Sequence, residues 1–282
     1  MTGYSLGILV LLSFNVIAAY AVYLPLAAGQ LNLGIAGFMV VGAYTASFLT
    51  NEFGWPVAGA VASGGAVAAA VALLVAIPIL RTHGIYLALA TFALGQVIAA
   101  IFLNLEVVGG ASGYPVTAHI EAIAVIGTAI GVVAFMALLS TTRFALYLTA
   151  VKSDPLVSDL MGINIRFIKV AAFTLGAAVA GIGGGLYAHH FNYIEAQYFS
   201  VMLSTYTVLY VLLGGTQTVW GPLVGALIFT LMPELLRSSA QWRYALFAVF
   251  IILFMAVRPQ GLLTTGFGSY LRKLVLRQDV AR

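Results

Sequence analysis

Residues 57–80 read VAGAVASGGAVAAAVALLVAIPIL, twenty-four consecutive positions without a charged side chain. A transmembrane helix needs about 20 apolar residues, so this stretch predicts a membrane span. Five more stretches of this kind lie at 5–24, 31–49, 85–103, 122–140 and 170–188. Three shorter ones follow at 199–213, 219–233 and 244–257, near the length at which a half-span competes with a full one.

The composition of the whole chain agrees with these spans. Of 282 residues, 62% are hydrophobic and 7% are charged, whereas a soluble domain is roughly 25% charged. So few charges cannot cover a soluble particle of this size. The composition also excludes a disordered chain and a nucleic-acid binder, and the absence of cysteine excludes a disulfide scaffold. We therefore expect an all-α polytopic membrane protein.

The charged residues predict the orientation. We predict nine spans, with eight or ten as alternatives. If the N-terminus is outside, nine spans place ten of the twelve cations on the inside. These ten are Arg81, Arg143, Lys152, Arg166, Lys169, Arg258, Arg272, Lys273, Arg277 and Arg282. The positive-inside rule requires this bias, so we expect a cytoplasmic C-terminus. Residues 1–24 lack the cations of a signal peptide, and we expect a span there despite the cleavage-like triplet 19–21.

The span interiors carry no Asp, Glu, Lys or Arg. This absence argues against a proton antiporter, a redox pump or a voltage sensor, although sodium could still be held by backbone carbonyls. No phosphate-loop motif or metal-binding histidine spacing occurs. We expect no catalytic residue, metal or cofactor, and we interpret the pair His189 and His190 as solvated at the membrane interface.

Two charge-free runs are interrupted by glycine, at 29–34 (GQLNLG) and at 214–222 (GGTQTVWGP). Transporters use broken helices beside their pathways, so both are candidates for re-entrant or unwound segments. A further glycine-rich stretch at 181–185 predicts close packing against another helix. Polar residues at depth are few and neutral, and each one alone is better explained by helix–helix hydrogen bonding than by a pathway wall.

The only long inside loop, 141–169, predicts a short helix. Asp154 is a capping residue and Pro155 suits the first helical position, while Gly162 suits the end. An apolar stripe faces away from the polar side of this helix; its members are Leu156, Val157, Leu160 and Met161. A helix of two turns is unstable alone and must dock on something. The spacing leaves open the membrane surface, the protein's own inner face and a partner's groove.

Several stretches resemble one family. Residues 150–164, AVKSDPLVSDLMGIN, are similar to a loop of bacterial ABC-importer permeases of the branched-chain amino acid (high-affinity leucine/isoleucine/valine) class. Further resemblances, in chain order, lie at 29–44, 84–92, 169–188 and 258–262 (RPQGL). The chain departs from the family pattern at Ser112, where Asp is frequent, and at Gln217, which replaces a glycine.

This resemblance implies a single permease domain, 1–282, in the bacterial inner membrane, surrounded by membrane lipid. It implies as partners two cytoplasmic ATPase subunits, a second permease subunit and a periplasmic substrate-binding protein. Region 150–164 becomes the coupling helix that the ATPases contact, through Asp154, Pro155, Leu156, Asp159, Leu160, Met161 and Gly162.

We expect the substrate pathway to include Gln30, Asn32, Thr91, Gln96 and Tyr206. The expected function is import of branched-chain amino acids or related small polar solutes, with ATP hydrolysed on separate subunits. The alternatives are a stand-alone channel or facilitator for a small neutral solute, and a membrane scaffold without transport of its own.

Overall fold

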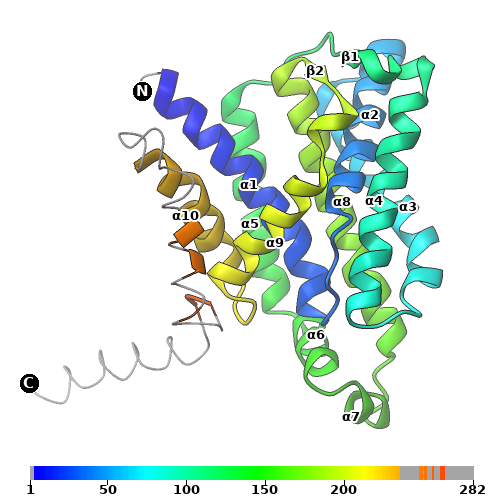
Figure 1. Cartoon of the computed structure of the whole chain (residues 1–282), viewed down its shortest axis with the longest axis vertical. Helices are drawn as coiled ribbons and strands as arrows, with labels where there is room; N and C mark the ends of the chain where they lie inside the picture. Colours follow the sequence, from blue (N-terminus) through cyan, green and yellow to red (C-terminus); the bar gives the residue numbers. More distant parts are fainter. Residues whose placement is uncertain (1–2, 236–247, 250, 253–255, 257–260, 264–282) are drawn as a thin grey trace, which may run out of the picture.

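A computed structural model describes residues 3–235, 248–249, 251–252, 256 and 261–263 (Figure 1). Six of its helical segments are long and apolar enough to cross a membrane. They are α1 (Gly3–Ala27), α3 (Val57–Ile79), α4 (Ile85–Asn104), α5 (Ala122–Ser140), α8 (Ile165–Phe191) and the segment Ala196–Gly214, which joins the 3-10 turn η3 (Ala196–Tyr198) to α9 (Val201–Gly214). The all-α polytopic class is thus confirmed.

Two more helices coincide with predicted spans but are not among these six. One is α2 (Ile35–Phe53), which begins four residues later than the predicted stretch at 31–49; the other is the shorter α10 (Gly221–Leu235). Most of the predicted span 244–257 lies outside the described residues, which include only 248–249, 251–252 and 256 of it. The count of nine spans and the orientation of the termini therefore remain predictions.

Helix α8 is central and packs against α1, α2 and α3. A Cβ atom added at Gly42 of α2 would collide with the backbone of Gly181, and one added at Gly184 would collide with the backbone of Met39. Backbones this close exclude any side chain larger than hydrogen, which explains the glycines of α8. The predicted close packing of residues 181–185 is confirmed.

The remaining helices surround this group. Helices α9 and α10 pack on each other and against α1, α5 lies beside α1, and α4 packs on α2. The side-chain amide of Asn15 in α1 donates to the hydroxyl of Thr230 in α10 at 2.9 Å. Here a polar side chain at depth joins two helices, as predicted for such residues.

The two ends of the bundle differ (Figure 1). At one end the short strands β1 (Tyr114–Pro115) and β2 (Tyr193–Ile194) pair antiparallel, close to the 3-10 turns η1 (Glu106–Val108) and η2 (Gly110–Ser112). The opposite end carries α6 (Arg143–Ser153) and α7 (Pro155–Leu160). The described charges follow this division, because four glutamates lie towards the strand end, and the cations of 81–169 lie at the α6–α7 end.

One prediction near the strand end is wrong. His189 is not solvated: its side chain is fully buried inside the bundle. Its ring Nε2 lies 2.9 Å from the Thr50 hydroxyl and its Nδ1 lies 2.8 Å from the Gly185 carbonyl. The imidazole finds both partners within the protein, so it can be buried without an unpaired nitrogen.

Candidate transport and coupling site

The first predicted break is a non-helical segment. Helix α1 ends at Ala27, residues 28–34 are irregular, and α2 begins only at Ile35. The backbone reverses at Gly29, whose φ of +75° is in the left-handed region that favours glycine. The amide of Gln30 then donates to the Pro25 carbonyl at 2.9 Å.

This segment returns into the helical bundle instead of remaining at its end. Gly34 lies against the backbone of Thr91 and Gly95 in α4, so tightly that a Cβ at Gly34 would clash with the Thr91 carbonyl. Non-helical backbone at this depth needs partners from side chains. The amide of Leu33 donates to the Thr91 hydroxyl at 3.1 Å, and the amide of Gly34 donates to the Asn32 side-chain carbonyl at 2.8 Å.

Two amide side chains in the segment are only partly satisfied. Gln30 and Asn32 are each 1% exposed. Both polar atoms of the Gln30 amide and the Nδ2 atom of Asn32 have no hydrogen-bond partner. A buried unpaired polar atom costs about 1–3 kcal/mol, so natural proteins rarely retain one without a reason. The two residues lie two positions apart in the same buried non-helical segment. Together they offer donors and an acceptor to a polar solute.

The structure brings together three of the five predicted pathway residues: Gln30, Asn32 and Thr91. The other two, Gln96 of α4 and Tyr206 of α9, have exposed side chains on outer faces of the bundle. The prediction missed Ser204, a buried residue of α9 whose hydroxyl accepts from the Ala36 amide at 3.0 Å. No sequence pattern signals this contact, because the two residues are far apart along the chain.

The second predicted break is a connection between two packed helices. Residues 215–220 join α9 to α10, with Gly215 at a φ of +109°. The hydroxyl of Tyr20 in α1 donates to the Val219 carbonyl at 2.9 Å. The amide of Leu262 donates to the Leu213 carbonyl at 3.0 Å, so the end of the 258–262 motif pairs with the last turn of α9.

The predicted short helix in the long loop is present as α7. The Asp154 carboxylate accepts from the Val157 amide at 3.1 Å, which caps the first turn. At the other end Gly162 has a φ of +78°, and the Ile163 amide donates to the Ser158 carbonyl at 3.0 Å. This is a Schellman motif with glycine in its left-handed position. The predicted caps at both ends are confirmed.

The apolar side of α7 is not docked on the described part of this chain. Leu156, Leu160 and Met161 are 75%, 80% and 77% exposed, and Val157 is also exposed. Figure 1 shows α7 beyond α6 at the extremity of the molecule. The described part of the protein's own inner face is thereby excluded as the docking surface for this stripe. A partner's groove or the membrane surface remains.

Helix α6 connects α7 to the two non-helical segments, residues 28–34 (the first interruption) and residues 215–220 (the second interruption). Its buried residues Leu148 and Val151 pack with Ala28 of the first interruption and with α8 in a small apolar cluster separate from the main core. Lys152 lies against Gly29, and its ammonium donates to the hydroxyl of Thr216, in the α9–α10 connection, at 3.1 Å. Partial desolvation lowers the pKa of Lys152 below its usual value.

Among the described residues, no three His, Asp or Glu side chains lie close enough together to hold a metal ion. The site therefore consists of a buried polar segment inside the bundle and an exposed apolar helix at one end, linked by α6. Such an arrangement suits the binding of a polar solute at depth and the transmission of a movement of α7 to that segment.

Comparison with known proteins identifies relatives of this chain. A family model described as "Branched-chain amino acid transport system / permease component" matches residues 4–257. The high-affinity branched-chain amino acid transport system permease protein LivM of Escherichia coli is 26% identical over 271 residues, which cover 83% of this chain and 64% of LivM. The chain thus spans less than two thirds of LivM.

Two other relatives match over shorter stretches. LivH of Escherichia coli, a permease protein of the same transport system, is 28% identical over 142 residues, covering 48% of this chain and 46% of LivH. The fructose import permease protein FrcC of Rhizobium meliloti is 28% identical over 127 residues, covering 42% of this chain and 35% of FrcC. No solved structure matches the chain.

The family match covers all the described helices, and the apolar helices agree with it. The chain is a multi-pass protein of the bacterial inner membrane. It belongs to the family of permease components of branched-chain amino acid transport systems.

Proposed function

We propose that the chain is the permease subunit of an ATP-driven ABC importer that carries branched-chain amino acids or related small polar solutes into the cytoplasm. The observation that carries this proposal is α7, a well-capped helix whose apolar residues Leu156, Leu160 and Met161 are exposed at the extremity of the bundle. Family membership supports the same function. An energy source on another chain also agrees with span interiors that lack charged residues.

Helix α7 would dock in a groove of a cytoplasmic ATPase. Three large apolar side chains on six residues cannot stabilise an isolated helix, and they gain by burial against a partner. A membrane surface is the alternative contact, because only residues 161–164 separate α7 from the span α8, and the ATPase recovery described below distinguishes the two. We therefore propose that residues 154–162 form the coupling contact, with one ATPase for this subunit and a second ATPase for the other permease subunit.

Lys152 would transmit movement of α7 to the pathway. This residue of α6 touches Gly29 in the first interruption and donates to Thr216 in the second. A displacement of α6 therefore reaches the buried polar segment and the α9–α10 connection together. Coupling of this kind requires a contiguous physical contact between two elements with alternative positions.

The substrate would bind at the first interruption. Broken helices in transporters present polar backbone and side-chain groups to solutes near the middle of the membrane. A free amino acid carries an ammonium, which can donate a hydrogen bond to the Gln30 amide oxygen. It also carries a carboxylate, which can accept hydrogen bonds from the amide nitrogens of Gln30 and Asn32. Gln96 and Tyr206 lie on exposed faces, where a second permease subunit would cover them.

The orientation follows from the charges. We propose that residues 1–282 form one permease domain of nine spans, with the N-terminus outside and the C-terminus in the cytoplasm. The α6–α7 end, which carries Arg143, Lys152, Arg166 and Lys169, would then face the cytoplasm. The opposite end, with β1 and β2, would receive the periplasmic substrate-binding protein.

Gentle solubilisation of the tagged chain tests this function. We expect an ATPase and a second permease to co-purify with the wild type. Leu160→Glu should lower ATPase recovery at least about tenfold, since a buried carboxylate would replace an apolar contact, and leave the membrane level of the chain unchanged. Thr149→Glu, which adds the same charge on an exposed position of α6, is the matched control.

Three results would contradict the proposal. A self-sufficient homo-oligomer that conducts solute without ATP would indicate a channel. An assembly without any transport would indicate a scaffold. Unchanged ATPase recovery with Leu160→Glu would remove α7 from the contact.

A further inference from the structure

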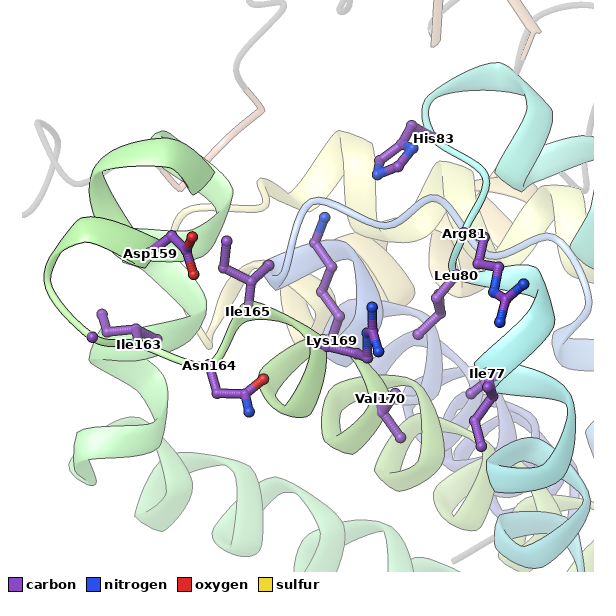
Figure 2. Close-up of a pocket in the computed structure, with 13 residues that line it drawn as sticks. Ile77, Leu80, Arg81, His83, Asp159, Ile163, Asn164, Ile165, Lys169 and Val170 are labelled. Atoms are coloured by element: carbon purple, nitrogen blue, oxygen red, sulfur yellow. The ribbon is translucent and has the colours of Figure 1, made fainter.

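A second feature of the α6–α7 end is a cavity that borders the proposed coupling contact and shares Asp159 and Gly162 with it. This cavity of about 770 Å³ opens between the connection from α3 to α4 and the segment that joins α7 to α8 (Figure 2). Its lining includes three permanent cations, Arg81, Arg166 and Lys169, together with His83. Asp159 is the only acidic residue in the lining. The cavity therefore concentrates positive charge.

No described residue neutralises these cations. Within residues 3–235 and the few described positions beyond them, the side chains of Arg81, Arg166 and Lys169 form neither a hydrogen bond nor an ion pair. Figure 2 shows the Lys169 side chain extending into the space between Asp159 and Ile165 on one side and Leu80, Arg81 and His83 on the other. Like charges gathered around one space repel each other unless an anion lies between them. The cavity has the charge and the volume for such an anion.

An apolar surface leads directly to this cavity. Ile77 of α3 belongs to the lining and is 59% exposed. One turn back along the same outer face lie Leu73 and Leu74, which are also exposed. Because α3 is long and apolar enough to cross a membrane and ends at Ile79, this face would lie against hydrocarbon up to the point where the cations begin. An occupant with an apolar tail and an anionic head would match both surfaces.

We propose that this cavity binds the phosphate head group of an anionic phospholipid from the leaflet at the α6–α7 end. One acyl chain would lie along Leu73, Leu74 and Ile77, and the phosphate would lie among Arg81, Arg166 and Lys169. Basic pockets beside transmembrane helices on the cytoplasmic side bind lipid head groups in this way. An acidic protein partner is less favoured, because Leu156, Leu160 and Met161 of α7 do not line this cavity.

Lipid competition on the purified, detergent-solubilised full-length chain tests the proposal. Phosphatidylglycerol and phosphatidylcholine with identical acyl chains are offered together, and bound lipid is counted by native mass spectrometry. We expect the wild type to prefer phosphatidylglycerol. Each neutralised cation should lower that preference about fivefold, so Arg81→Gln/Lys169→Gln should lower it about 25-fold. Arg143→Gln removes a charge at the same end outside the cavity and should leave the preference unchanged.

Three further measurements test for a damaged fold, a free-anion site and an acidic protein surface. Arg81→Lys keeps the positive charge at this position. It should therefore keep the preference for phosphatidylglycerol, provided that the fold is intact. Inorganic phosphate or glycerol phosphate that displaces the lipid at equal concentration would overturn the proposal in favour of a free-anion site. Equal binding of both lipids, or an equal loss in Arg143→Gln, would also overturn it. So would loss of the lipid when the chain is purified together with its ATPase, since an acidic protein surface would then be the occupant.

Discussion

At the first interruption, substitutions of Gln30 and Asn32 can distinguish a contribution to the stability of the fold from a contribution to substrate binding. Gln30 is buried with both polar atoms of its amide unpaired, whereas Asn32 uses its carbonyl oxygen to hold the Gly34 amide. An unpaired buried amide contributes nothing to folding and costs desolvation. Its presence therefore points to a ligand, and the two neighbours should respond differently to the same kind of substitution.

Gln30→Leu should leave the free energy of unfolding unchanged or slightly higher, because it replaces unpaired polar atoms with apolar ones. The same change should lower substrate uptake about tenfold or more, the cost of one lost ligand hydrogen bond. Thermal unfolding in detergent and uptake by the assembled transporter measure the two quantities. Thr128→Val at a half-buried position of α5, outside the proposed site, is the control. A loss of stability that accompanies the loss of uptake would assign Gln30 to packing.

Lys152 permits a second residue-scale test. Lys152→Met keeps the aliphatic stem that packs beside Gly29 and removes the donor to Thr216. We expect normal ATPase recovery and ATP hydrolysis, with uptake per ATP reduced several-fold. Thr216→Val removes the same hydrogen bond from the other side and should reproduce the effect. Full uptake in both variants would show that movement reaches the pathway by another route.

At the scale of elements, glycine decides how closely the helices approach. Gly184 of α8 lies against the backbone of Met39, whereas a Cβ at Gly127 of α5 would meet no atom within 4 Å. The same substitution should therefore have opposite effects at the two positions. Gly184→Ala should destabilise the protein by about 1–3 kcal/mol through overpacking, and Gly127→Ala should stabilise it by about 0.5–1 kcal/mol through helix propensity. Thermal unfolding of both variants measures the difference, and equal shifts would contradict this packing.

The sequence predicted elements better than their contacts. The lengths of the stretches without charged residues predicted the long helices. The capping residues Asp154 and Gly162 predicted the ends of α7 to within about one residue. Glycine also marked the first interruption, although α2 begins later than its apolar stretch does. The spans are apolar all round, so periodicity does not tell which face of α4 or α9 is buried. For that reason the sequence grouped Gln96 and Tyr206 with Thr91 and Asn32, although Gln96 and Tyr206 lie on exposed faces, and it missed Ser204.

At the scale of the whole molecule, the scarcity of charged residues bears on the energy source for transport as well as on the location of the chain in a membrane. Charged side chains lie at the two ends, and the described spans offer none for ion coupling. The proposed energy source on another chain agrees with this distribution of charge, and α7 has the exposed apolar surface for a contact with that chain. The cavity beside it adds a separate contact with lipid at the same end.

Uptake of labelled leucine into proteoliposomes tests the coupling role of α7 most directly. The vesicles contain the complete transporter, with the wild-type chain or with Leu160→Glu, and the binding protein is supplied outside with or without ATP inside. The proposed mechanism predicts uptake that requires ATP and that falls at least about tenfold with Leu160→Glu, for loss of an apolar contact worth roughly 1.4 kcal/mol or more. Full ATP-dependent uptake with Leu160→Glu, or flux through this chain alone without ATP, would contradict it.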